Sequence, residues 1–168
     1  MKINRAILQT NKKQVFEEEV DFSKLPLDEN HVKRITKCLV KVEATDFDDV
    51  LEYLITGEAD VIASCSYTLE DVPLHVSFKE QLFFSDQDDD SMDCYFEPGV
   101  EIDLDPHILA LILAEVPHNI VKSGASLPKS GNGYRVLKEE DFEEERKHRK
   151  NSAFDVLDTL EIEEDDNN

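Results

Sequence analysis

Three segments of the chain, residues 32–44, 55–65 and 72–84, alternate between apolar and polar side chains, and this pattern limits the fold more than any other feature. A period of two is typical of a strand with one face in a core and the other in water. Clean alternation also favours antiparallel pairing, because an antiparallel sheet tolerates one solvated face. The sequence therefore predicts an antiparallel sheet, open or partly closed. Cys38 and Cys65 fall on the apolar side and are expected in the core.

One strong helix is expected after the sheet, at residues 106–116. Asp105 suits the N-cap position, Pro106 suits the first helical position, and Leu104 is placed to pack against Leu109. Apolar residues surround the helix axis, so we expect the helix to be buried against the sheet. Pro117 ends it.

The C-terminal part of the chain is polar. Residues 123–133 are rich in Gly, Ser and Pro and indicate a surface loop. A charged, solvated helix is predicted at 138–150, a short amphipathic helix at 151–160 and a disordered acidic tail at 161–168. The predicted class is α+β, with one buried helix and polar C-terminal helices. Residues 1–150 are expected to form a single domain, since domains most often contain about 100 to 150 residues.

The net charge of −21 is unevenly distributed along the chain. Residues 1–42 carry +3, residues 43–121 carry −19 and residues 122–168 carry −5. Between Lys79 and Lys122 there are eleven acidic residues and no Lys or Arg. Because negative charge repels phosphate, this stretch is a poor binder of nucleic acid and a candidate surface for a basic partner.

Two groups of charged residues are candidate binding sites. The acidic group, which would bind a basic protein, consists of Asp86, Asp88, Asp89, Asp90, Asp93, Glu97, Glu101 and Asp103. A solvated loop and a calcium loop are the other interpretations, although the Gly and Glu of an EF-hand loop are missing. The basic group, which would contact RNA, consists of Lys2, Arg5, Lys12, Lys13, Lys37 and Lys41. Ordinary solvated charge is the alternative there, since no aromatic residues are interleaved with these cations.

The sequence indicates neither a metal site nor a catalytic site. Cys38, Cys65 and Cys94 form no CxxC pair and have no zinc-ligand spacing with the histidines. Residues 124–130 have Pro128 where a phosphate loop needs glycine. Residues 64–66 lack the glycine-flanked turn of a nucleophile. We therefore expect no enzyme activity, no metal or other cofactor and no small-molecule substrate.

The chain is expected to be cytoplasmic, with reduced thiols. Its longest apolar run, residues 108–114, is far shorter than the roughly twenty residues that cross a bilayer. Its first residues lack the apolar core of a signal peptide. The odd number of cysteines argues against a disulfide framework.

Several segments, in their order along the chain, resemble the YceD-like family, the large ribosomal RNA subunit accumulation proteins. The resemblance is carried by VIASCSYTLEDV at 61–72, the Asp-rich loop, VEIDLD at 100–105, ILALILAEVP at 108–117, GYRVLKEEDFEEE at 133–145 and the segment 154–160. It implies a bacterial, non-catalytic factor that is needed for accumulation of 23S ribosomal RNA. Many relatives have a CxxC pair and a second Cys-rich knuckle; here Cys65-Ser66-Tyr67-Thr68 and residues 123–133 take these places. A zinc site is therefore not implied for this chain.

Two mechanisms remain open. In the first, the acidic segment from Asp86 to Asp105 holds a Lys- and Arg-rich ribosomal protein or assembly partner of the large subunit until rRNA competes for it. In the second, the basic N-terminal third contacts 23S rRNA directly. A hydrolytic or metal-dependent enzyme has the least support, because no acid, base or nucleophile constellation is present.

Overall fold

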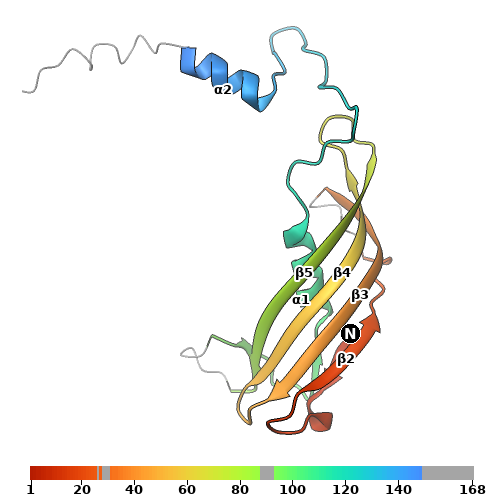
Figure 1. The fold of residues 1–168 in the computed structure, drawn as a ribbon, viewed down its shortest axis with the longest axis vertical. Helices are drawn as coiled ribbons and strands as arrows, with labels where there is room; N and C mark the ends of the chain where they lie inside the picture. The colour runs from red at the N-terminus through yellow and green to blue at the C-terminus, as the bar shows by residue number, and fades with distance from the viewer. Residues whose placement is uncertain (26, 28–30, 88–92, 149–168) are drawn as a thin grey trace, which may run out of the picture. The chain divides into compact units, whose positions relative to one another are not determined.

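The structure, a computed structural model, describes residues 1–25, 27, 31–87 and 93–148 and has an α+β fold (Figure 1). The chain divides into two compact units, Met1–Ala125 and Ser126–Asn168. The first unit contains all the named strands and helix α1 (Asp105–Glu115), and the second contains helix α2 (Glu139–His148). The domain expected at 1–150 thus includes the first unit and part of the second.

The first unit is built on a five-stranded sheet in the order β2-β3-β4-β5-β6. The strands are β2 (Gln14–Glu19), β3 (Val32–Asp46), β4 (Leu51–Ser64), β5 (Asp71–Ser85) and β6 (Tyr95–Phe96). Strands β2 to β5 pair in antiparallel fashion, whereas β6 pairs with β5 in parallel. Within the described residues β2 and β6 do not pair with each other, so the sheet is open and does not form a barrel. The three alternating segments are confirmed as the long central strands.

Strand β3 contains two irregularities that the alternation did not predict. The register with β4 shifts between Val32 and Arg34 and again between Ile35 and Lys37. Each extra residue resets which side chains face inward. Val32, Ile35 and Cys38 are consequently all buried, at 1%, 3% and 0% exposure, although they are three residues apart.

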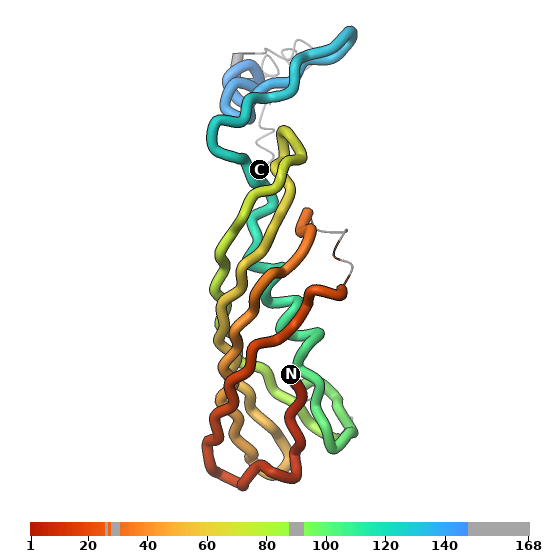
Figure 2. Tube along the Cα trace, turned by 90° about the vertical axis from the view of Figure 1, so that its right-hand side faces the viewer, coloured from red at the N-terminus to blue at the C-terminus, as the bar shows by residue number. Residues whose placement is uncertain are grey.

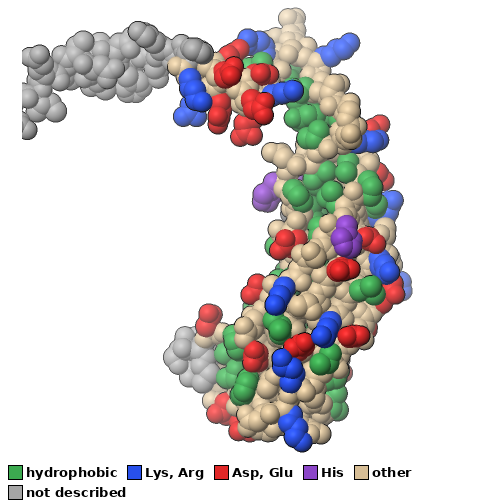
Figure 3. All heavy atoms as spheres, viewed as in Figure 1, with side chains coloured by type: hydrophobic (Ala, Val, Ile, Leu, Met, Phe, Trp, Pro, Cys, Tyr) green, Lys and Arg blue, Asp and Glu red, His purple; other side chains and the backbone are tan. Residues whose placement is uncertain are grey.

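The two faces of the sheet differ in composition. The inner face carries the buried residues of β3, β4 and β5 and packs against α1, which lies along one side of the sheet (Figure 2). The outer face, opposite α1, carries acidic and basic side chains next to each other (Figure 3). This division follows from the alternation, because successive residues of a strand point to opposite faces.

Helix α1 begins one residue earlier than predicted. Leu104, which is fully buried, is its N-cap residue, and the predicted cap Asp105 is already helical. No side chain caps the helix at Leu104, although Oδ1 of Asp103, the residue before it, accepts a hydrogen bond from the Asp105 N–H at 3.0 Å. The expectation that Asp105 is the N-cap was wrong by one residue.

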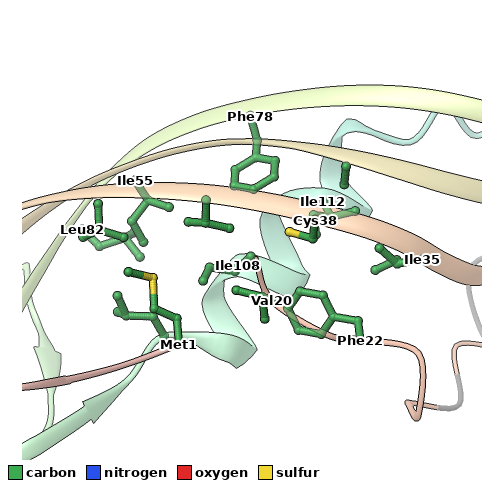
Figure 4. Packing of buried hydrophobic residues seen from close by; sticks show 14 of the residues in the cluster. Met1, Val20, Phe22, Ile35, Cys38, Ile55, Phe78, Leu82, Ile108 and Ile112 are labelled. Atoms are coloured by element: carbon green, nitrogen blue, oxygen red, sulfur yellow. The ribbon is translucent and has the colours of Figure 1, made fainter. Parts of the chain in front are cut away.

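One face of α1, rather than its whole circumference, is buried. Ile108 and Ile112 are fully buried and lie among Cys38, Phe78 and Val20 (Figure 4). Burying one isoleucine side chain contributes about 1.5 to 3 kcal/mol. Leu109, Leu111 and Leu113 pack against this core from the sides and are partly exposed.

The first unit also contains a second, two-stranded sheet, which lies next to the start of α1. It pairs β1 (Lys2–Asn4) with β7 (Glu101–Asp103) in antiparallel fashion. Ile3 and Ile102 lie opposite each other and are both buried. The pairing brings the predicted basic N-terminus directly against the predicted acidic segment.

The second unit has no buried residue between positions 126 and 147. A turn joined by the bridge between Gly131 and Tyr134 precedes α2, and Arg135 Nη2 lies 2.6 Å from Glu145 Oε2. The charged helix predicted at 138–150 is confirmed as α2 over the residues described. The predictions for 151–160 and 161–168 lie outside the described residues. No helix in the described ranges has the length and apolar character needed to span a bilayer.

Candidate functional site

Lys2 of the predicted basic group is paired with two members of the predicted acidic group. Its Nζ lies 3.4 Å from Glu101 Oε1 and 3.7 Å from Asp103 Oδ2. The β1–β7 register causes this, because it places Lys2 opposite Asp103. The hydrogen bond to Glu101 is the main reason that the pKa of Lys2 is raised. The two candidate sites therefore partly neutralise each other.

Arg5 makes three contacts that connect the N-terminal part of the chain to the acidic segment. Its Nη1 lies 3.3 Å from Asp86 Oδ2, and its Nη2 donates to the carbonyl oxygen of Glu97. Its backbone N–H donates to the carbonyl of Val100 at 2.8 Å. The side chain is only 18% exposed, and the partners of its Nη1 and Nη2 lie within the fold, whereas its buried Nε has no hydrogen-bond partner in the described residues.

The other basic candidates are spread over the first unit. Lys13 Nζ lies 2.7 Å and Lys41 Nζ 3.0 Å from the carboxylate of Glu43, whose pKa is lowered chiefly by the hydrogen bond from Lys13. Lys12 donates to Gln9 Oε1 at 2.9 Å. Lys37 lies opposite Asp60 in the register but forms no ion pair within the described part of the chain. Lys13 and Lys41 therefore meet at Glu43, whereas Lys2 and Arg5 pair with the acidic segment.

The acidic candidates fall into three sets. Asp86, Glu101 and Asp103 are paired with cations of β1 and the turn after it, as described above. Asp93 and Glu97 form no ion pair among the residues that the structure describes, and the Asp93 side chain is exposed. The remaining three candidates, Asp88, Asp89 and Asp90, lie outside the described residues.

A chain of aromatic rings runs from the core to the surface beside Glu97. Tyr53, which is fully buried, meets Phe84 edge-on with ring centroids 5.3 Å apart. Phe84 contacts Tyr95 at 5.4 Å, and His107 of α1 lies 4.6 Å from Tyr95 and 5.2 Å from Phe84. Tyr95 is 49% exposed. The sequence did not predict this cluster, because its four members come from four different elements, β4, β5, β6 and α1.

Burial keeps His107 from becoming charged. Desolvation lowers its pKa, while the nearby carboxylates of Glu97 and Asp103 act in the opposite direction. The ring is therefore neutral at pH 7, so it adds no positive charge to the acidic surface around it.

A second acidic surface lies at the β2 edge of the sheet. Glu17, Glu18 and Glu19 form no ion pair within the described ranges, and with Leu39 and Glu58 they line a hollow of about 630 Å³. Leu39 is 42% exposed. These glutamates were not predicted as a site, because the net charge of residues 1–42 combines them with nine Lys and Arg residues.

Cys65 and Cys38 are both fully buried, as predicted, but their thiols differ electrostatically. The pKa of Cys65 is lowered to about 7, first by the Lys122 N–H, which donates to Sγ at 3.4 Å, and then by Thr68. Burial instead raises the pKa of Cys38 to about 11. Across the residues described, no three His, Cys, Asp or Glu side chains are grouped so as to hold a metal ion.

These features describe an acidic α+β protein with an open sheet, an exposed tyrosine, carboxylates that form no ion pair among the described residues, and several cations that pair with the chain's own acids. The chain is 30% identical over 134 residues to the uncharacterized protein YlbN of Bacillus subtilis, and the alignment covers 75% of this chain and 77% of YlbN. The chain therefore belongs to the same family as YlbN. No protein-family model matches it. No solved structure matches it.

Proposed function

We propose that this protein is a bacterial, cytoplasmic, YceD-like factor in the biogenesis of the large ribosomal subunit. In this proposal it has no catalytic activity and promotes the accumulation of 23S rRNA by binding a basic ribosomal protein or assembly partner. The resemblance of residues 61–72, 100–105 and 108–117 supports the family assignment. The chemistry of the partner is supported by the charges of the folded chain.

One observation carries the choice of a basic protein partner, namely the pairing of the N-terminal cations with the chain's own carboxylates. Lys2, Arg5, Lys13 and Lys41 all lie within 4 Å of an acidic side chain. Residues 43–121 carry −19. A surface of this sign attracts cationic proteins from a distance and repels rRNA, so the first encounter is with the protein.

Direct binding to 23S rRNA by the basic N-terminal third is the second candidate. It is favoured by Lys12 and Lys37, which form no ion pair in the described part of the chain. Two separated lysines neutralise few phosphates, and each neutralised phosphate adds only a small increment to affinity. The protein partner is therefore the better-supported proposal.

The proposal can be tested in Bacillus subtilis lacking YlbN. We expect this strain to have a lowered ratio of 23S to 16S rRNA, and we expect expression of this chain to restore the ratio. A variant with Asp93→Asn and Glu97→Gln should restore it less well, whereas a variant with Glu139→Gln and Glu140→Gln in α2 removes the same charge and is the control. An unchanged ratio in the strain without YlbN would refute the ribosomal role.

A further inference from the structure

We infer that Tyr95 and Glu97 form a binding site for an arginine side chain of a basic protein. The inference rests on the proposed function for the nature of the partner, and it adds the side chain that is recognised. Tyr95 lies at the edge of the five-stranded sheet, on the two-residue strand β6.

The ring of Tyr95 is exposed on one side and fixed on the other. Tyr95 is 49% exposed, while the rings of Phe84 and His107 pack against its ring with centroids 5.4 Å and 4.6 Å away. Phe84 is itself held by the buried Tyr53. A ring that is already ordered loses little conformational entropy when a ligand stacks on it. Tyr95 is therefore a preorganised platform.

Glu97 directly follows β6, and its carboxylate is close enough to His107 to act on the pKa of this ring, which contacts Tyr95. Its N–H donates to the carbonyl of Ser85 at 2.8 Å, so the pairing with β5 continues past Phe96. The backbone of Glu97 is fixed at its carbonyl as well, by the guanidinium of Arg5. In the described residues its carboxylate has no cation as partner, so it is available to a ligand.

The combination fits a guanidinium better than an ammonium or a phosphate. A planar guanidinium stacks on an aromatic ring and can donate two hydrogen bonds to one carboxylate, whereas lysine presents a strongly hydrated point charge. Phosphate is disfavoured by Glu97 and by the exposed Asp93 nearby in the sequence. The neutral His107 supplies no charge that would repel a cation.

The test uses the full chain and two short peptides of equal charge, one of alternating Gly and Arg and one of alternating Gly and Lys. Binding is measured at low salt by fluorescence anisotropy. We expect the Arg peptide to bind about two- to five-fold more tightly than the Lys peptide, as for an exposed cation–π contact. Tyr95→Leu should remove this difference, while Tyr95→Phe should keep it because the ring remains.

Two control variants locate the effect. Tyr134→Leu removes another exposed tyrosine, 61% accessible and in the second unit, and should leave the preference for arginine unchanged. Glu97→Gln should weaken the binding of the Arg peptide more than that of the Lys peptide, because the paired hydrogen bonds between guanidinium and carboxylate are lost. Urea unfolding of each variant confirms that it is folded.

Equal affinity of the two peptides for the unmodified chain would overturn the inference, and so would an undiminished preference in Tyr95→Leu. Failure to bind either peptide would also overturn it. None of these results decides the ribosomal role, because a basic protein can be held by charge alone. That role is decided separately by the 23S to 16S ratio.

Discussion

The guanidinium nitrogen Nη1 of Arg5 lies 3.3 Å from the carboxylate oxygen Oδ2 of Asp86. The sequence presented Arg5 as a candidate RNA contact and Asp86 as a candidate protein contact. In the fold the two residues hold each other, and Arg5 also binds the Glu97 carbonyl. We therefore assign Arg5 a structural role, as the tether of the segment between β5 and β7.

Replacing Arg5 should destabilise the protein. Arg5→Ala leaves Asp86 and the Glu97 carbonyl without their donor, and we expect a loss of about 1 to 3 kcal/mol in the free energy of unfolding. The free energy of unfolding of Arg5→Lys should lie between those of the parent and Arg5→Ala, because an ammonium lacks the forked donors with which a guanidinium reaches both acceptors. Urea unfolding measures the free energy of unfolding of each variant. The control is Lys12→Ala at an exposed position, which should change this free energy by less than about 0.5 kcal/mol. If Arg5→Ala were as stable as Lys12→Ala but lost RNA affinity, Arg5 would be an RNA contact instead.

Gly57 should not tolerate a side chain. It lies opposite Phe78 in the register, and a Cβ added to it would lie 2.4 Å from Phe78 Cζ and 2.7 Å from the Leu39 carbonyl oxygen. We expect Gly57→Ala to cost about 1 to 3 kcal/mol through overpacking. Gly99→Ala is the matched control, since its nearest contact would be 3.4 Å from Glu101 O. A thermal melt in which both variants match the parent would show that the sheet accommodates the methyl group.

Cys65 should titrate near neutral pH. Its pKa of about 7 lies below the ordinary 9.0, because N–H groups of Lys122 and of residues 67 and 68 point at the sulfur. A depressed folded pKa stabilises the fold fully above pH 9 and ceases to do so as the pH falls through 7. Ultraviolet thiolate absorbance should therefore show a step near pH 7 that Cys65→Ser removes and Cys94→Ser keeps. A first step only above pH 8 would contradict this arrangement of donors.

His75 should hold its proton more tightly than a free histidine. Its Nδ1 lies 2.8 Å from Asp60 Oδ1, and that hydrogen bond is the main cause of its raised pKa. The resulting stabilisation is full below the unfolded pKa of about 6.5 and disappears as the pH rises through the folded pKa. An NMR titration of the imidazole should give a lower pKa in Asp60→Asn than in the parent. Identical titration curves would show that the contact does not persist in solution.

The long strands could be read from the sequence because each carries its own alternation over many residues. The β1–β7 pair could not, since each strand has only three residues and the two are about a hundred positions apart. Strand β6, with two residues, has no pattern of its own. The shifts at Val32 and Ile35 were hidden for a similar reason, because a bulge interrupts the period on which the prediction relies.

The candidate site was predictable in its charge and not in its geometry. The net charges of consecutive sequence segments identified the acidic segment. They assigned Lys2 and Glu101 to two separate surfaces, although the fold places Lys2 Nζ 3.4 Å from Glu101 Oε1. Tyr95 and His107 come together only when β6 lies beside β5 and α1 covers the inner face. Such contacts depend on tertiary packing, which local residue patterns do not encode.

The most direct test of the account is the binding of purified large-subunit ribosomal proteins to this chain, compared with the binding of 23S rRNA fragments, at low and moderate salt. We expect salt-sensitive binding of at least one basic protein, weakened by Asp93→Asn with Glu97→Gln, and much weaker binding of rRNA. Tight rRNA binding that requires Lys12 and Lys37, with no affinity for any of the basic proteins, would contradict it.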